Sequence, residues 1–163
     1  MERDTTLARL LVERGAEVDL RLAAGLGMLD NVKGFLDKGV PSQAANRLYR
    51  ANLDTILTHH QVIDEALNFA AYGGHEETVD FLLTAGASPN GLAGQWWPWD
   101  VNSTALHKAV MAQNLAMVRF LLERGADPSI GRTMERDTVS VVPVLRQHGH
   151  TSVVTRHPYR AVA

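Results

Sequence analysis

The 163-residue chain has no cysteine, so neither disulfide bonds nor thiolate metal ligands are available to it. It also has no apolar run approaching the roughly 18 residues that a membrane-spanning helix requires. The charged N-terminus, Met1 to Asp4, lacks the apolar core of a signal peptide. These absences favour a cytoplasmic location, and the excess of arginine over lysine is a weak indication of a GC-rich bacterial genome.

Several chemical signatures are missing as well. The chain has no G-x-S-x-G elbow, no His-Glu-x-x-His helix and no phosphate-binding glycine loop after a strand. Its net charge of −2 does not favour nucleic acid as a partner. With 45% hydrophobic residues, the chain has enough apolar material for one domain with an adequate core. We therefore expect a non-enzymatic protein without cofactor or metal.

The most informative feature is a repeated stretch, found at residues 65–90 and again at 104–129. Three parts of the two stretches match in order: an Ala-Leu opening, a Val-x-Phe-Leu-Leu run and a Gly-Ala pair. Small residues in the first part favour a helix that neighbours approach closely, and the second run has helical i, i+3, i+4 spacing. Glycines and Pro89 end these helices. Each unit is therefore predicted to be a helix pair that must stack on others.

This pattern resembles the ankyrin repeat, whose units open with T-P-L-H-x-A-A, turn at G-H and close with V-V-x-L-L and G-A-D-x-N. The resemblance implies an all-α, ankyrin-like helical solenoid of about four repeats, with an inserted helix and an enlarged Trp-rich finger loop. The expected divisions are a half repeat at 5–17, a repeat at 18–39, an insertion at 40–64, a repeat at 65–90, a finger loop at 91–103, a repeat at 104–129, a C-terminal capping repeat at 138–157 and a tail at 158–163.

The half repeat is predicted to contain one helix, Thr5 to Arg14, with Asp4 as its N-cap. In the repeat register it is a second helix without its first. Three explanations remain open: a truncated start, a cap of another kind, or self-association through this orphan helix. In the next unit, the apolar stripe of a second helix is expected to consist of Val32, Phe35 and Leu36. Too few residues precede this unit to form the β-hairpin finger found between ordinary ankyrin repeats.

The insertion is expected to contain a helix from Ala44 to His60, which is either a spacer or a functional element, namely a lid or a partner-binding helix. His59 and His60 are adjacent and point in different directions, so they do not suggest a metal site. The resemblance instead gives His75, His107 and His150 structural roles, in which they bond to backbone and hold neighbouring repeats together.

The finger loop contains all three tryptophans, and tryptophan is enriched at binding hot spots. By resemblance, partner contacts also come from the positions that follow each Ala-Ala pair, with the small Gly25, Gly73 and Ala112 leaving room for the partner. The predicted partner-binding residues are Tyr72, Trp96, Trp97, Trp99, Asp100, Asn102, Met111 and His148.

Two functions remain open. In the first, the chain is a non-catalytic module that binds a protein partner of unknown identity through its concave face and Trp-rich finger. In the second, the insertion helix and the Trp loop enclose a small-molecule pocket near Tyr72, Trp97 and Met111, in a ligand-binding protein or an unusual enzyme. Asp100, beside Trp99, would then be the candidate acid.

Overall fold

The computed structural model describes residues 5–46, 58–92, 103–134 and 137–140. These residues form seven α-helices, one short 3-10 helix and two small hairpins. In chain order the elements are α1 (Thr6–Glu13), α2 (Leu20–Gly25), α3 (Leu29–Phe35), β1 (Leu36–Asp37), β2 (Val40–Pro41), η1 (Gln43–Asn46), α4 (His59–Gly73), α5 (Glu76–Thr84), α6 (Ala105–Met111), α7 (Leu115–Glu123), β3 (Gly131–Met134) and β4 (Asp137–Ser140). The described part is thus all-α apart from the hairpins.

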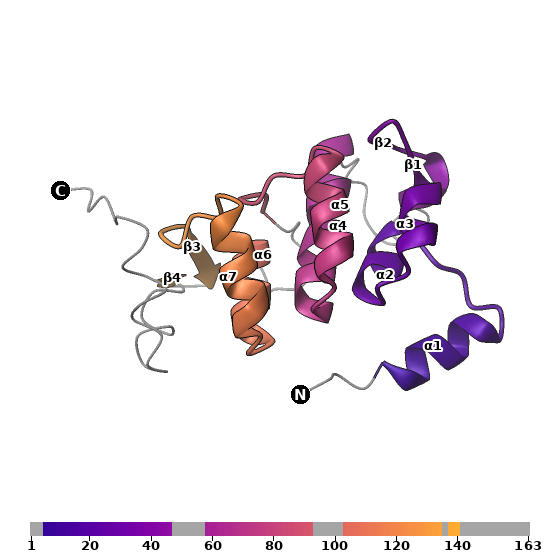
Figure 1. The fold of residues 1–163 in the computed structure, drawn as a ribbon, viewed down its shortest axis with the longest axis horizontal. Coiled ribbons are helices and arrows are strands. Elements are labelled where there is room, and N and C mark those ends of the chain that lie inside the picture. The colour runs from indigo at the N-terminus through magenta and orange to yellow at the C-terminus, as the bar shows by residue number, and fades with distance from the viewer. Residues whose placement is uncertain (1–4, 47–57, 93–102, 135–136, 141–163) are drawn as a thin grey trace.

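The helices form a row of antiparallel pairs, α2 with α3, α4 with α5 and α6 with α7 (Figure 1). We call the first helix of each pair the inner helix and the second the outer helix. The inner helices pack on one another in sequence order, α2 on α4 and α4 on α6. Helix α1 lies beside the first pair and runs across the direction of the other helices, while the β3–β4 hairpin lies at the opposite end of the row (Figure 1).

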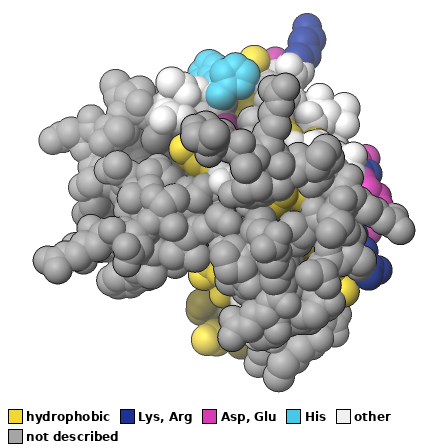
Figure 2. All heavy atoms as spheres, turned by 90° about the vertical axis from the view of Figure 1, so that its left-hand side faces the viewer, with side chains coloured by type: hydrophobic (Ala, Val, Ile, Leu, Met, Phe, Trp, Pro, Cys, Tyr) yellow, Lys and Arg dark blue, Asp and Glu magenta, His cyan; other side chains and the backbone are white. Residues whose placement is uncertain are grey.

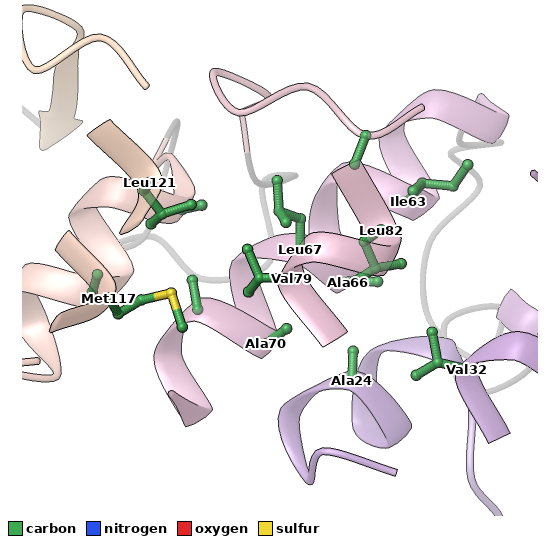
Figure 3. Packing of buried hydrophobic residues seen from close by; sticks show 14 of the residues in the cluster. Ala24, Val32, Ile63, Ala66, Leu67, Ala70, Val79, Leu82, Met117 and Leu121 are labelled. Atoms are coloured by element: carbon green, nitrogen blue, oxygen red, sulfur yellow. The ribbon is translucent and has the colours of Figure 1, made fainter. Parts of the chain in front are cut away.

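The inner and outer helices contribute side chains of different size to the core, as the sequence predicts. Inner helices contribute fully buried alanines such as Ala66 and Ala70, which let adjacent helices approach closely. Outer helices contribute larger side chains, and Val79, Leu82 and Leu121 point into the same cluster (Figure 3). Burying one such side chain stabilises a fold by about 1.5–3 kcal/mol, so the stacked pairs together supply a core that no single pair has.

The helix pairs predicted within 65–90 and 104–129 are present, but the first of them begins earlier than predicted. Helix α4 begins at His59, inside the stretch assigned to the insertion. The reason is a capping box: the Thr58 side chain accepts from the Gln61 backbone N–H, and the Gln61 side chain accepts from the Thr58 backbone N–H. The predicted insertion helix from Ala44 to His60 is therefore wrong at its C-terminal end. Its first residues lie in η1, and residues 47–57 lie outside the described part.

The unit at 18–39 ends differently from the prediction. Helix α3 stops at Phe35, and Leu36 lies in strand β1 rather than on a helical stripe. A tight turn with positive φ at Lys38 (51°) and Gly39 (81°) reverses the chain, so that Leu36 pairs with Pro41. Leu36 is nevertheless buried in the core, because the strand carries it to the same cluster.

Both ends of the described part also differ in detail from the predictions. Helix α1 begins at Thr6, so its N-cap is Thr5 rather than Asp4, and no side-chain bond caps it. At the other end, strand β4 pairs with β3 over Asp137–Ser140. The predicted capping repeat at 138–157 therefore starts within a strand, and its remaining residues lie outside the described part.

Candidate partner-binding surface

The inner helices α4 and α6 position the two predicted partner-binding residues that the structure describes. Helix α6 starts at Thr104, whose Oγ1 accepts from the backbone N–H of His107, while His107 Nδ1 accepts from the backbone N–H of Thr104 at 3.3 Å. This reciprocal cap fixes where the helix begins, and with it the direction of every later side chain. The prediction that His107 bonds to backbone is confirmed, and its role in holding neighbouring repeats together stays a prediction.

Tyr72 and Met111 occupy equivalent positions, directly after the Ala70-Ala71 and Ala109-Val110 pairs near the C-terminal ends of their inner helices. Because α4 packs on α6, these positions lie on neighbouring helices of the row. The Met111 side chain is 48% exposed and Tyr72 is partly exposed, whereas Ala70, Ala71 and Ala109 behind them are fully buried. The predicted positions therefore do face the surface.

Phe69 belongs to the same surface, although the sequence analysis did not select it. It lies one helical turn before Tyr72 on α4, and i, i+3 neighbours share a helix face. It is 45% exposed, which is unusual for a phenylalanine in a unit whose core is well packed. The signal was available, because Phe69 alternates with alanines in the inner-helix pattern. We call Phe69, Tyr72 and Met111 the inner-helix surface.

The small residues beside this surface have another role than the predicted one. A Cβ at Gly73 would lie 2.5 Å from the Gly25 carbonyl oxygen and 2.6 Å from the His75 ring, and a Cβ at Gly25 would lie 3.4 Å from the Phe69 ring. Gly73 is thus required by close packing between α2 and α4, whereas an added Cβ at Gly25 would make an ordinary van der Waals contact. The expectation that Gly73 leaves room for a partner is wrong, because the protein itself fills that space; for Gly25 and Ala112 it stays a prediction.

His75 joins two units at this point. Its Nε2–H donates to the Gly25 carbonyl at 3.1 Å, and its ring would collide with a Cβ at Gly27 as well as at Gly73. Burial lowers the pKa of His75 below its usual 6.5; the bond to Gly25 opposes this shift, and the nearby Arg9 guanidinium adds to it. The predicted structural role of His75 is confirmed. His150 lies outside the described residues.

The remaining predicted site residues also lie outside the described part: Trp96, Trp97, Trp99, Asp100, Asn102 and His148. The same holds for most of the loop that would close the alternative small-molecule pocket. Their roles stay predictions. On the outer helix α5, the carboxylates Glu76, Glu77 and Asp80 are exposed.

A buried ionic cluster was missed by the sequence analysis. Arg21 on α2 donates to Asp19 at 2.7 Å and to Glu65 on α4 at 3.0 Å, and all three residues are buried. Arg21 holds the repeat position that His107 holds in α6, so a polar group there was foreseeable. Its partner Glu65 was not, because it is 44 residues away.

Asn68 holds the same repeat position in α4, and there the polar group is left unpaired. It is fully buried, and neither its Oδ1 nor its Nδ2 has a hydrogen-bond partner among the described residues. In α6 the equivalent His107 caps the helix start, but α4 begins about two turns earlier, at His59. The early start therefore removes the backbone N–H groups that a side chain at this position would cap.

Little in the described residues suggests catalysis or metal binding. Within them, no group of three histidine, aspartate or glutamate side chains is arranged to hold a metal ion. Burial raises the pKa of Asp64, although a bond from the Ser88 backbone N–H and the nearby His60 oppose this shift. The Asp64 carboxylate packs against Gly91 and fixes the loop after α5, which is a structural role. Figure 2 shows described histidine side chains together at the upper edge of the molecule, seen from the left-hand side of Figure 1.

Stacked helix pairs with packed inner helices define the class of helical repeat solenoids. A family model described as ankyrin repeats (3 copies) matches residues 20–132, so the chain belongs to the ankyrin-repeat family. Ankyrin repeats generally mediate protein–protein interaction, and the family is typically non-enzymatic. Among the described residues, no helix has the length and apolar character needed to cross a membrane.

Similar proteins occur in animals. Palmitoyltransferase ZDHHC13 of Homo sapiens is 39% identical over 120 residues, which cover 74% of this chain and 16% of that protein. The mouse protein of the same name is 29% identical over 120 residues. Ankyrin repeat and KH domain-containing protein mask-1 of Caenorhabditis elegans is 30% identical over 157 residues, or 92% of this chain and 5% of that protein. The chain thus spans at most 16% of these relatives, which are eukaryotic. The expected bacterial source and cytoplasmic location stay predictions.

Proposed function

We propose that the chain is a non-catalytic interaction module that binds a protein partner through its inner-helix surface together with the finger loop at 91–103. The observation that carries this proposal is the exposure of Phe69 and Met111 on helices whose other apolar residues are mostly buried. Side chains that pack so poorly within the fold contribute little to its stability. Contact with something outside the fold would bury them.

The proposed contact combines three kinds of side chain. Phe69 and Tyr72 provide aromatic surface with few rotatable bonds, and Met111 provides a flexible apolar side chain that adapts to a partner. The finger loop adds Trp96, Trp97 and Trp99, with Asp100 and Asn102 as polar contacts, and His148 extends the surface along the row. Within this set, Trp97 is proposed as a hot spot, whose replacement by Ala weakens binding by about 2 kcal/mol or more.

The proposal is tested by comparative co-purification. Tagged wild-type protein, Met111→Glu and Arg119→Glu are expressed at equal levels, and the proteins retained with each are quantified. Arg119 is exposed on the outer helix α7, which makes it a matched surface control. We expect at least one protein that is retained by the wild type and the control but lost with Met111→Glu. Retention of the same proteins by all three forms would contradict the proposal.

A further inference from the structure

The side chain of Asn90 joins the loop after α5 to the loop after α7. Its Oδ1 accepts from the Asp127 backbone N–H at 2.7 Å, and its Nδ2 donates to the Gly125 carbonyl at 3.2 Å. The two loops lie side by side at one edge of the row (Figure 1). Both bonds of this one amide therefore connect one repeat to the next, across 37 and 35 residues of sequence.

Asn90 is also followed by Gly91, in the only Asn-Gly pair of the chain. An asparagine before a glycine is chemically labile, because glycine has no Cβ to keep its backbone nitrogen away from the side-chain carbonyl carbon of the asparagine. Asparagine is for this reason among the thermolabile residues of proteins. Of all the asparagines in the chain, Asn90 thus has the greatest tendency to lose its side-chain amide.

Packing requires the glycine at this position. A Cβ at Gly91 would overlap the Asp64 Cγ and lie 2.7 Å from the Asp64 Cβ. The Asp64 side chain cannot move aside without loss, because its Oδ1 accepts from the Ser88 backbone N–H at 2.7 Å. The labile Asn-Gly pair is therefore a consequence of how the loop after α5 packs on α4.

The folded protein holds the reacting groups apart. The Gly91 N–H donates to the Ser88 carbonyl at 2.9 Å, and the Asn90 N–H donates to the Ser88 Oγ at 3.2 Å. For the side chain to react, the Gly91 nitrogen must leave the Ser88 carbonyl and approach the Asn90 Cγ, while the amide releases the loop after α7. These bonds lie at the surface, so a local opening of the two loops breaks them without unfolding the core.

We propose that Asn90 is a site of spontaneous deamidation, which proceeds when the two loops separate and then weakens their return. In the open state the Gly91 N–H loses its proton to solvent, and the nitrogen attacks the Asn90 Cγ. The new C–N bond closes a succinimide ring, the Cγ–Nδ2 bond breaks, and the nitrogen leaves as ammonia. Water then opens the ring to give aspartate or isoaspartate at position 90. Overall, one water is consumed and one ammonia is released.

The product lacks the donor that holds the Gly125 carbonyl. A carboxylate at position 90 has no N–H, so an oxygen faces that carbonyl in place of the donor. The new charge also adds to those of the neighbouring Asp64 and Asp127, whereas Arg124 is already paired with Asp80 at 2.7 Å. Deamidation thus loosens the junction between the loops after α5 and α7.

The first test compares the deamidation rate of the folded chain with that of the same chain in guanidinium chloride, at one pH and one temperature. Peptide mass spectrometry measures the replacement of NH2 by OH at Asn90, and Asn114, which is followed by leucine, is the internal control. We expect Asn90 to react about tenfold or more faster in the unfolded chain, and Asn114 to react far less in both. Equal rates at Asn90 in the two states, or an unmodified Asn90 in the unfolded chain, would overturn the proposal.

A second test opens the loop without unfolding the chain. Asp64→Ala removes the acceptor of the Ser88 N–H and should raise the deamidation rate of the folded protein. Glu77→Ala, at an exposed position on α5, should leave the rate unchanged. If circular dichroism shows that Asp64→Ala is not folded, Ser88→Ala takes its place, because it removes the acceptor of the Asn90 N–H. A folded variant that reacts no faster than Glu77→Ala would contradict control by loop opening.

The effect of the product is measured with Asn90→Asp. Its melting temperature should be about 2–4 °C below that of the wild type, as expected for the loss of one hydrogen bond in a chain of this size. Asn31→Asp makes the same chemical change at an exposed position in the first turn of α3 and should not lower the melting temperature. If Asn90→Asp melted at the wild-type temperature, deamidation would leave the junction intact and the proposal would be wrong.

Discussion

Arg21 and Glu65 form an ion pair between α2 and α4, with 3.0 Å between Nη1 and Oε2 and side chains that are 5% and 1% exposed. A charge buried to this extent is costly unless it is paired, so removing one partner costs more than the pair itself contributes. The pair also specifies which inner helices meet, because an unpaired guanidinium would disfavour any other register.

Glu65→Ala is expected to lower the free energy of unfolding by about 3 kcal/mol, since the buried Arg21 would lose the Glu65 carboxylate. The measurement is urea denaturation followed by circular dichroism. Glu77→Ala, at an exposed position on α5, serves as the control and should change the stability by less than about 0.5 kcal/mol. If both substitutions lowered the free energy of unfolding equally, the buried pair would contribute no more to stability than an exposed residue.

Asn68→Leu is expected to stabilise the protein by about 1–3 kcal/mol, because it removes two buried polar atoms that have no partner and keeps a similar side-chain volume. Asn114→Leu is the matched control. The Asn114 side chain caps α7 by accepting from the Met117 backbone N–H, so its loss should destabilise by about 1 kcal/mol. If both substitutions destabilise, Asn68 has a partner in solution.

Two glycine substitutions test whether Gly73 is small because the protein packs against it. Gly73→Ala should destabilise the isolated chain by several kcal/mol, on the order of an overpacked core site, because the new methyl group meets the Gly25 carbonyl and the His75 ring. Gly34→Ala should stabilise it by about 0.5–1 kcal/mol, because Gly34 is exposed within α3 and no atom lies near its Cβ position. A neutral Gly73→Ala variant would restore the interpretation that this position leaves space for a partner.

His75 gives the stability a defined pH dependence. Its pKa in the folded protein lies below the ordinary 6.5 of the unfolded chain, so the fold favours the neutral ring. The stabilisation is fully present above pH 6.5 and is lost as the pH falls from 6.5 through the folded-state pKa. Melting temperatures from pH 8 to pH 5 should therefore fall more for the wild type than for His75→Gln. If the melting temperature fell equally with pH in both proteins, His75 would not contribute to the pH dependence of stability.

The sequence predicted the repeat pairs well because their signals are local. Helices α5 and α7 are determined by periodic apolar residues and by the glycines that end each helix, and these signals do not depend on the rest of the chain. The early start of α4 was also encoded locally, in the Thr58-x-x-Gln61 capping box, but the repeat register concealed it.

Other features depend on distant contacts that no local pattern reveals. The Arg21–Glu65 pair joins residues 44 apart, and the close packing of Gly73 depends on a carbonyl from another unit. For the candidate site, repeat alignment was sufficient to find Tyr72 and Met111. It did not identify Phe69, although that residue alternates with alanines in the same inner-helix pattern.

The most direct test of the proposed function is the dissociation constant of a co-purified partner, measured by isothermal titration calorimetry with wild-type protein and with Met111→Ala. We expect at least tenfold weaker binding by the variant, about 1.4 kcal/mol, with an unchanged melting temperature because Met111 is largely exposed. An unchanged dissociation constant in a folded Met111→Ala variant would contradict the assignment of the inner-helix surface as the partner-binding site.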